Sequence, residues 1–196
     1  PNNEMSGLRT ALAMGAESAI LVSDDSLAGS DALSTAKVLA AAINRCEPTL
    51  ILTATESSDG YTGTVPAQIA EILDLPSVTF AKEISVDGEV VSVKRQTEEG
   101  YDEVECPLPC VVSVTAGGVE PRYPSFKGIM AAKNKPVEEL DLAALGIEEG
   151  TVGWSGARQE IIEIAQAPER EAGEIIVDEG GAHERIMAFL DELKVL

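Results

Sequence analysis

Apolar and polar residues along the first third of the chain follow the order helix, strand, helix, strand, helix. Apolar residues at helical spacing predict helices over 6–14, 32–43 and 65–72. Short apolar runs at 18–22 and 49–53 predict strands between these helices. Crossovers of this length require parallel strands, so the pattern predicts an α/β fold whose parallel sheet carries helices on both faces.

The periodicity changes after Asp74. Residues 77–85 and 89–96 alternate as strands around Asp87-Gly88, a strong signal for a two-residue hairpin turn. Two more strands are expected at 101–105 and 110–115. We therefore predict an antiparallel hairpin added to the mainly parallel sheet.

Core-forming content thins from Pro136 onward. A short helix is expected at 140–145, short strands at 160–164 and 174–177, and an amphipathic helix at 183–194. A segment with so few core residues of its own needs another protein surface to pack against. We expect two parts: an α/β domain over 1–136 and a C-terminal arm over 137–196 that contacts a partner subunit.

Composition narrows the class of protein. The chain has 196 residues, 44% of them hydrophobic, which is typical of a globular domain. A formal charge of −20 disfavours binding to nucleic acid and anionic membrane surfaces, and no apolar run approaches the roughly 20 residues of a membrane span. Three cysteines without zinc-type spacing, two of them in CPLPC at 106–110, indicate buried thiols in a reducing, cytoplasmic setting.

One segment runs against this negative charge. Residues 120–135 gather four cations with no acid after the first position: Arg122, Lys127, Lys133 and Lys135. Tyr123, Phe126 and Met130 are interleaved with them. This combination predicts a docking surface for an acidic protein, in which the apolar side chains anchor and the cations steer.

A purely structural interpretation stays open beside it. Pro124 and Ser125 are typical of a helix N-terminus, and the spacing of Phe126, Ile129 and Met130 fits a helix face turned inward. Lysines late in such a helix complement its dipole. Composition and spacing alone do not choose between the two interpretations.

Loop 54–65, ATESSDGYTGTV, lies between the end of a predicted strand and the start of a helix. Strand ends and helix N-termini are where α/β sheets bind phosphates. Gly60 and Gly63 would allow the backbone to approach a ligand closely, and Asp59 could accept a hydrogen bond from a ribose hydroxyl. The hydroxyl donors of the loop are Ser57, Ser58, Thr62 and Thr64. It contains neither a Walker A nor a GxGxxG motif, so ordinary helix capping stays an equal alternative.

Other polar groups carry no catalytic arrangement. Asp24 and Asp25 have no His or third acid at ligand spacing, so we expect a solvated turn and no metal site. His183 is the single histidine, and nothing pairs it with a nucleophile. The sequence therefore favours a carrier over an enzyme with its own substrate.

Four segments in fixed order resemble the electron transfer flavoprotein beta subunit. They are GLRTALAMGAESAILVSDDSLAGSDALSTAKVLAAAI, ESSDGYTGTVPAQIAEILDLP, VKRQTEEGYDEVECPLPCVVSV and VEPRYPSFKGIMAAKNKPVE. The resemblance is strong over 9–135 and weaker beyond Pro136, where APEREAGEIIVDEGG is similar to the family's C-terminal arm. It implies a three-layer α/β/α sandwich of the adenine nucleotide alpha hydrolase-like type.

The resemblance also implies the function and its residues. The beta subunit pairs with an alpha subunit that holds the redox FAD, and it accepts electrons from acyl-CoA or related flavin dehydrogenases. It binds structural AMP, or a second FAD in electron-bifurcating relatives, through residues that match here as Ser58, Asp59, Thr62, Gly63, Thr64 and Val65. The recognition segment maps to Arg122, Tyr123, Phe126, Lys127, Met130 and Lys133.

Two alternatives and two departures accompany this resemblance. The alternatives are a nucleotide-binding regulator or hydrolase of universal-stress-protein-like fold, and a scaffold without a ligand. Family members carry a further βα portion before the segment that matches residues 3–14, so the chain is expected to lack a first portion of the domain. Phe126 replaces a smaller aliphatic residue of many relatives, and the basic run is thinner than in some of them.

Overall fold

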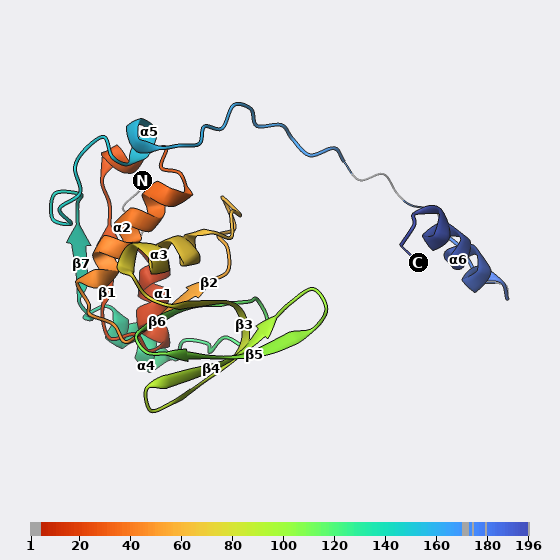
Figure 1. Ribbon diagram of the computed structural model, residues 1–196, viewed down its shortest axis with the longest axis horizontal. Helices are drawn as coiled ribbons and strands as arrows, with labels where there is room; N and C mark the ends of the chain where they lie inside the picture. The colour runs from red at the N-terminus through yellow and green to blue at the C-terminus, as the bar shows by residue number, and fades with distance from the viewer. Residues whose placement is uncertain (1–4, 170–172, 174, 179, 196) are drawn as a thin grey trace. The chain divides into compact units, whose positions relative to one another are not determined.

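The structure is a computed structural model that describes residues 5–169, 173, 175–178 and 180–195. The chain forms two compact units, residues 1–160 and 161–196. Figure 1 shows the first unit as helices packed on short strands, with a long hairpin at one end. Each unit is described by itself below.

The first half of the chain folds in the predicted order. It forms α1, β1, the short 3₁₀ helix η1, α2, β2 and α3: Ser6–Met14, Ala19–Val22, Asp25–Leu27, Ala32–Asn44, Leu50–Ala54 and Val65–Leu73. Asp31 begins α2 as its N-cap, since its Oδ1 accepts from the N–H of Ser34 at 2.8 Å. The helices and strands expected here are confirmed to within two residues.

The predicted hairpin is also present. The next elements are β3, β4, β5 and β6: Ser77–Asp87, Val90–Gln96, Tyr101–Pro107 and Cys110–Val114. β3 and β4 pair antiparallel across the turn after Asp87, whereas β6 pairs parallel with both β2 and β3. The α/β class with mostly parallel strands and an antiparallel addition is confirmed.

The strands form two separate sheets within the described residues. β2, β6, β3, β4 and β5 make one sheet in that order, and β1 pairs parallel with β7, Val137–Leu140, in another. A single, mainly parallel sheet with an added hairpin was expected, so only the separate β1–β7 pair differs from that expectation.

Side-chain alternation along β6 separates two parts of the core. Val111 faces α2 and α3, where it packs with Ile51 and Ile69. Cys110 and Val112 point to the opposite face and pack with buried residues of the hairpin. Strand β6 is thus buried on both sides, and it holds the helical layer and the hairpin together.

Residues 137–160 belong to the first unit, whereas the arm was expected to start at 137. Strand β7 extends the β1 sheet, and Leu142 and Val152 pack on Val38 of α2. A strand, turns and the short helix α5, Gly153–Gly156, replace the expected helix at 140–145. Apolar residues at 140, 142 and 152 give this stretch the core contacts that its composition had not revealed.

Two acids fasten this stretch to the unit. Asp24, expected in a solvated turn, accepts from the N–H groups of Ser26 (2.9 Å) and Leu142 (3.2 Å), and these bonds lower its pKa. Oδ2 of Asp31 accepts from the N–H of Arg158. Both carboxylates therefore have a structural role.

The second unit contains α6, Ala182–Glu192, which confirms the amphipathic helix expected at 183–194. The described residues at 160–164 and 175–177 form no strand, contrary to prediction, and Glu174 lies outside the described residues. No described helix combines the length and apolar character needed to cross a bilayer.

Candidate functional site

A turn separates β6 from the basic segment 120–135, which has no regular structure at 120–125 and then forms the helix α4, Phe126–Ala132. Ser125 is its N-cap and accepts from the N–H of Gly128 at 3.1 Å. Tyr123, Phe126 and Met130 are 92%, 91% and 63% exposed. The helix of the structural interpretation exists, but its face bearing Phe126 and Met130 is turned to solvent in this chain.

The segment is fastened to α1 rather than to the sheet. A side chain at Gly128 would overlap the carbonyl oxygen of Ala13, so glycine permits the close approach of α4 to α1. Nη1 of Arg9 donates to the carbonyl oxygens of Ala132 (2.7 Å) and Lys135 (3.2 Å) at the end of α4. The exposed aromatic residues are therefore carried on a fixed base.

The four cations of the segment divide into two groups. Nζ of Lys135 donates to the carbonyl oxygens of Leu12 (2.9 Å) and Ala16 (2.6 Å), where it caps the end of α1. Lys135, expected to be presented, is thus structural. Arg122, Lys127 and Lys133 are exposed, and none forms an ion pair with another described residue.

The loop at 55–64 lies at the carboxyl end of β2 and leads into α3. Thr64 is the N-cap without a side-chain hydrogen bond, so the first turn of α3 has no side-chain acceptor from its own cap. Gly63 adopts a φ of 66°, which favours glycine. The hydroxyl of Ser57 and the N–H of Gly60 lower the pKa of Asp59 and keep it ionised.

The six residues predicted to bind a nucleotide are only partly gathered. Gly63 and Thr64 line a surface hollow of about 550 Å³ with Gln68 and Phe80. Ser58, Asp59, Thr62 and Val65 lie outside the hollows found around this loop.

Two side-chain atoms near the loop are buried without a hydrogen-bond partner, Oγ1 of Thr53 and Oε1 of Gln68. Thr53 is the penultimate residue of β2, just before the loop. Nε2 of Gln68 donates to Oγ1 of Thr64 at 3.4 Å. Buried polar atoms normally have partners, so these two are exceptions. Gln68 lines the hollow with Gly63 and Thr64, whereas Thr53 lines neither hollow at the loop.

Sequence reasoning missed a second hollow beside the loop. It holds about 770 Å³ and is lined by Thr55, Tyr61, Phe80 and Arg95, among others. Tyr61 and Phe80 adopt φ values of 48° and 61°, which are rare for aromatic residues. The N–H of Phe80, turned out of the ladder at a bulge in β3, donates to Oγ of buried Ser113 at 3.1 Å. No pattern in the sequence predicts positive φ angles at these two residues.

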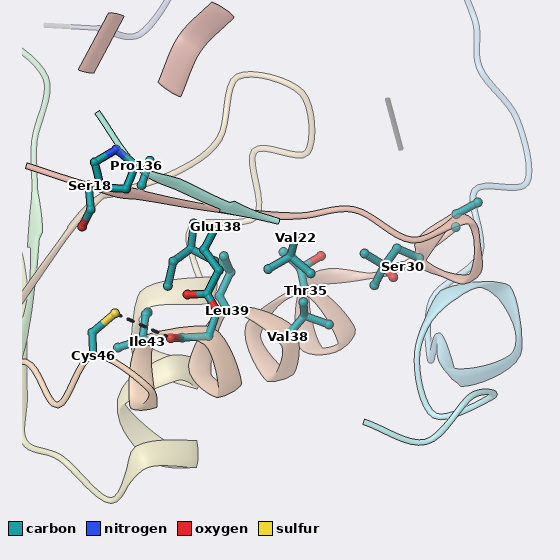
Figure 2. Close-up of a pocket in the computed structure, with 16 residues that line it drawn as sticks. Ser18, Val22, Ser30, Thr35, Val38, Leu39, Ile43, Cys46, Pro136 and Glu138 are labelled. Atoms are coloured by element: carbon teal, nitrogen blue, oxygen red, sulfur yellow. Dashed lines mark hydrogen bonds between the residues drawn. The ribbon is translucent and has the colours of Figure 1, made fainter. Parts of the chain in front are cut away.

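A further hollow, of about 870 Å³, lies between α2 and the β1–β7 pair. Figure 2 shows Val38, Leu39 and Ile43 of α2 facing Val22 and Glu138 across it. Leu39 was expected in the buried face of its helix and lines this hollow instead. Its walls are mostly apolar.

The cysteines have the structural role that CPLPC predicted. Cys106 and Cys110 are buried, and Cys46, which lines the hollow beside α2, is exposed. Burial, followed by the neighbouring Cys106, raises the pKa of Cys110 to about 11. A thiol with so high a pKa is a poor nucleophile at neutral pH.

Comparisons with known proteins agree with this architecture. Residues 1–145 match the family described as "Electron transfer flavoprotein domain". The electron transfer flavoprotein subunit beta of Mycobacterium leprae (strain TN) is 43% identical over 197 residues, which cover 100% of this chain and 74% of the relative. The beta subunit of Megasphaera elsdenii is 36% identical over 90% of this chain and 68% of its own length.

A relative with a different name matches as well. The "acryloyl-CoA reductase electron transfer subunit gamma" of Anaerotignum propionicum is 34% identical over 95% of this chain and 72% of its own length. The identities extend beyond the matched domain into the C-terminal unit, because several alignments cover nearly the whole chain. The chain belongs to the electron transfer flavoprotein family, in its beta-subunit branch, and its role is electron transport.

Proposed function

We propose that this chain is the beta subunit of a heterodimeric electron carrier whose alpha subunit holds the redox FAD. The FAD accepts and releases the electrons, and the beta chain supplies the surface where a flavin dehydrogenase docks. The observation that supports this role is the exposed cluster of Tyr123, Phe126 and Met130 on α4, surrounded by cations on a body of charge −20. The beta chain itself catalyses no reaction on a substrate of its own.

The chemistry of this cluster supports docking to an acidic surface. Buried aromatic and methionine side chains dominate protein–protein contacts, and opposite charges speed the encounter. Arg122, Lys127 and Lys133 are free to meet carboxylates, because none is committed to an ion pair within the described residues. The relative named for acryloyl-CoA reductase supports a partner that acts on acyl-CoA.

Substitution of Phe126 tests the proposal. In the purified heterodimer, Phe126→Ala should slow reduction by an acyl-CoA dehydrogenase at limiting carrier concentration by at least about tenfold, the size of a moderate interface hot spot. Flavin content and melting temperature should not change. The control is Tyr101→Ala, which changes another exposed aromatic residue, the first residue of β5. Unaltered reduction kinetics for Phe126→Ala would rule out docking at α4.

We also propose that the loop at 55–64 contributes to a site for structural AMP or a second FAD. The open N-terminus of α3 suits a phosphate, and ionised Asp59 suits a ribose hydroxyl. Gln68 lines the same hollow as Thr64, and its unpartnered Oε1 fits a further polar atom of such a ligand.

Nucleotide content of the purified heterodimer tests this second proposal. Denatured protein should release AMP, or FAD beyond one per alpha subunit, and Asp59→Ala with Thr64→Ala should lower that amount. A control pair in the same chain, Asp87→Ala with Ser92→Ala in the hairpin, should release the wild-type amount. Wild-type protein that neither retains nor rebinds either nucleotide would exclude the site.

The second unit is proposed to dock on the alpha subunit. Ile161, Ile162 and Ile164 are each at least 76% exposed, and α6 exposes Ile186 and Phe189. Apolar side chains on an extended segment gain stability by burial on a partner.

The matches do not support the universal-stress-protein-like alternative. Because the described cysteines are all thiols, we place the heterodimer in the cytoplasm.

A further inference from the structure

A recess lies on the flank of α4, where this helix diverges from α1. The two helices touch at Gly128 and Ala13, and Arg9 joins them again at the end of α4. Between these contacts they leave a space of about 500 Å³, lined by Arg9, Thr10, Ala13, Pro124, Ile129, Ala132 and Lys133. Its walls are mainly aliphatic, and two cationic residues stand at its edge.

The walls of this recess are held in place. Arg9 and Lys135 fix the two helices through four hydrogen bonds of 2.6–3.2 Å, so the space persists without a ligand to prop it open. Ala132 is buried, and Ile129 is half-exposed above the recess. A preformed apolar recess reduces the ordering cost that binding must overcome.

The recess adjoins the docking residues. Ile129 lines it and is the immediate neighbour of Met130 on α4, while Pro124 lines it between Tyr123 and the helix N-cap. A surface that covers Phe126 and Met130 therefore reaches the mouth of the recess. Anchors on one side of an interface commonly pair with anchors on the other.

Charge selects the occupant. Lys133 lines the recess, and Lys127 and Arg122 belong to the same segment, whereas the chain as a whole carries −20. A second copy of this chain, equally acidic overall, is repelled at long range. An apolar side chain flanked by carboxylates satisfies both the walls and the rim.

We propose that docking is reciprocal: Phe126 enters the dehydrogenase, and an apolar side chain of the dehydrogenase, flanked by acids, enters the recess between α1 and α4. This inference rests on the proposed docking function and adds the partner's contribution to it. It predicts that filling the recess blocks docking without altering Phe126.

Thr10 is the position for the test, because its side chain is exposed and lines the recess. In the heterodimer, Thr10→Phe should raise the carrier concentration for half-maximal reduction about tenfold, with an acyl-CoA dehydrogenase that reduces the wild type. Thr10→Leu fills less space and should give an intermediate increase. Ala11→Phe is the matched control, since Ala11 is the next exposed residue of α1 and does not line the recess.

The outcomes separate the two proposals. Wild-type kinetics for both Thr10 variants, together with impaired Phe126→Ala, would overturn reciprocal docking and leave docking at α4 intact. Wild-type kinetics for Phe126→Ala as well would overturn both. The melting temperatures of Thr10→Phe, Thr10→Leu and Ala11→Phe should match that of the wild type. Impairment of Ala11→Phe equal to that of Thr10→Phe would also contradict the inference.

Discussion

The basic segment 120–135 and the C-terminal unit 161–196 both expose large apolar side chains, but their backbones are held differently. Ser125, Arg9 and Lys135 give the segment a capped helix on a fixed base. In the second unit, no backbone hydrogen bond joins two described residues between 161 and 178. Its helix α6 has no buried residue.

This difference indicates two kinds of contact. A surface whose shape exists before binding pays little ordering cost and suits brief encounters with exchanging partners. A segment that lacks internal support acquires its order from the partner and suits a lasting assembly. This contrast supports the proposal that the segment serves transient docking and the second unit serves the stable heterodimer.

The strongest test removes the apolar face of α6. Ile186→Asp with Phe189→Asp should weaken association with the alpha subunit by at least about 100-fold, because two interface anchors become charged. Sedimentation of the mixed subunits measures this loss. Glu184→Gln with Asp191→Asn, on the same helix, is the control and should leave the heterodimer intact. An unchanged heterodimer for the aspartate variant would refute the assignment.

A side chain at Gly128 should separate α4 from α1. Gly128→Ala is expected to cost about 2–3 kcal/mol in free energy of unfolding, because the added methyl group meets the backbone oxygen of Ala13. Denaturant unfolding of the heterodimer measures it. Gly7→Ala, in open space on α1, is the matched control and should be neutral or stabilising. Equal stability of the two variants would mean that the helices do not meet closely.

Arg9→Ala should have a smaller effect. Loss of both hydrogen bonds from its guanidinium to α4 is expected to cost about 1.5 kcal/mol in free energy of unfolding. Arg45→Ala removes a surface ion pair of 2.8 Å to Glu138 and should cost less than about 1 kcal/mol. If Arg45→Ala lowers the stability to thermal unfolding more than Arg9→Ala does, the hydrogen bonds from Arg9 do not stabilise the end of α4.

Alkaline pH provides a reference from the core of the first unit, where Cys110 is buried. In the folded chain the pKa of Cys110 is about 11 against 9.0 for an ordinary thiol, so the unfolded chain loses this proton first. Stability should fall from pH 9 to 11, by about 1 kcal/mol at pH 10. Cys110→Ala should remove this component, seen as a difference from the wild-type profile. Identical slopes would contradict the burial of this thiol as its cause.

Local patterns in the sequence predicted much of the fold. Helical spacing within 6–14 and Asp87-Gly88 between alternating strands act over short distances, and both elements formed as expected. Strand β7 was missed because VEEL carries two acids in four residues, and its pairing with β1 depends on chain more than 100 residues away. Such pairing leaves no local signal.

The candidate sites show the same limit. The sequence placed Phe126 among cations, but it could not reveal that Lys135 turns to the carbonyl oxygens of α1 while Lys133 stays exposed. The two lysines differ only in which helix end lies within reach. Likewise, the hollow at Tyr61 and Phe80 depends on backbone angles that neither residue favours.

The exchange of cations between α1 and α4 has a dynamic consequence. Arg9 belongs to α1 and closes α4, and Lys135 follows α4 and closes α1, so neither helix can fray without uncovering carbonyl groups of the other. The two helices should open as one cooperative unit, and their amide protons should exchange with a common opening free energy. A dehydrogenase that holds Phe126 would then slow amide exchange along the whole of α1, including its residues outside the recess.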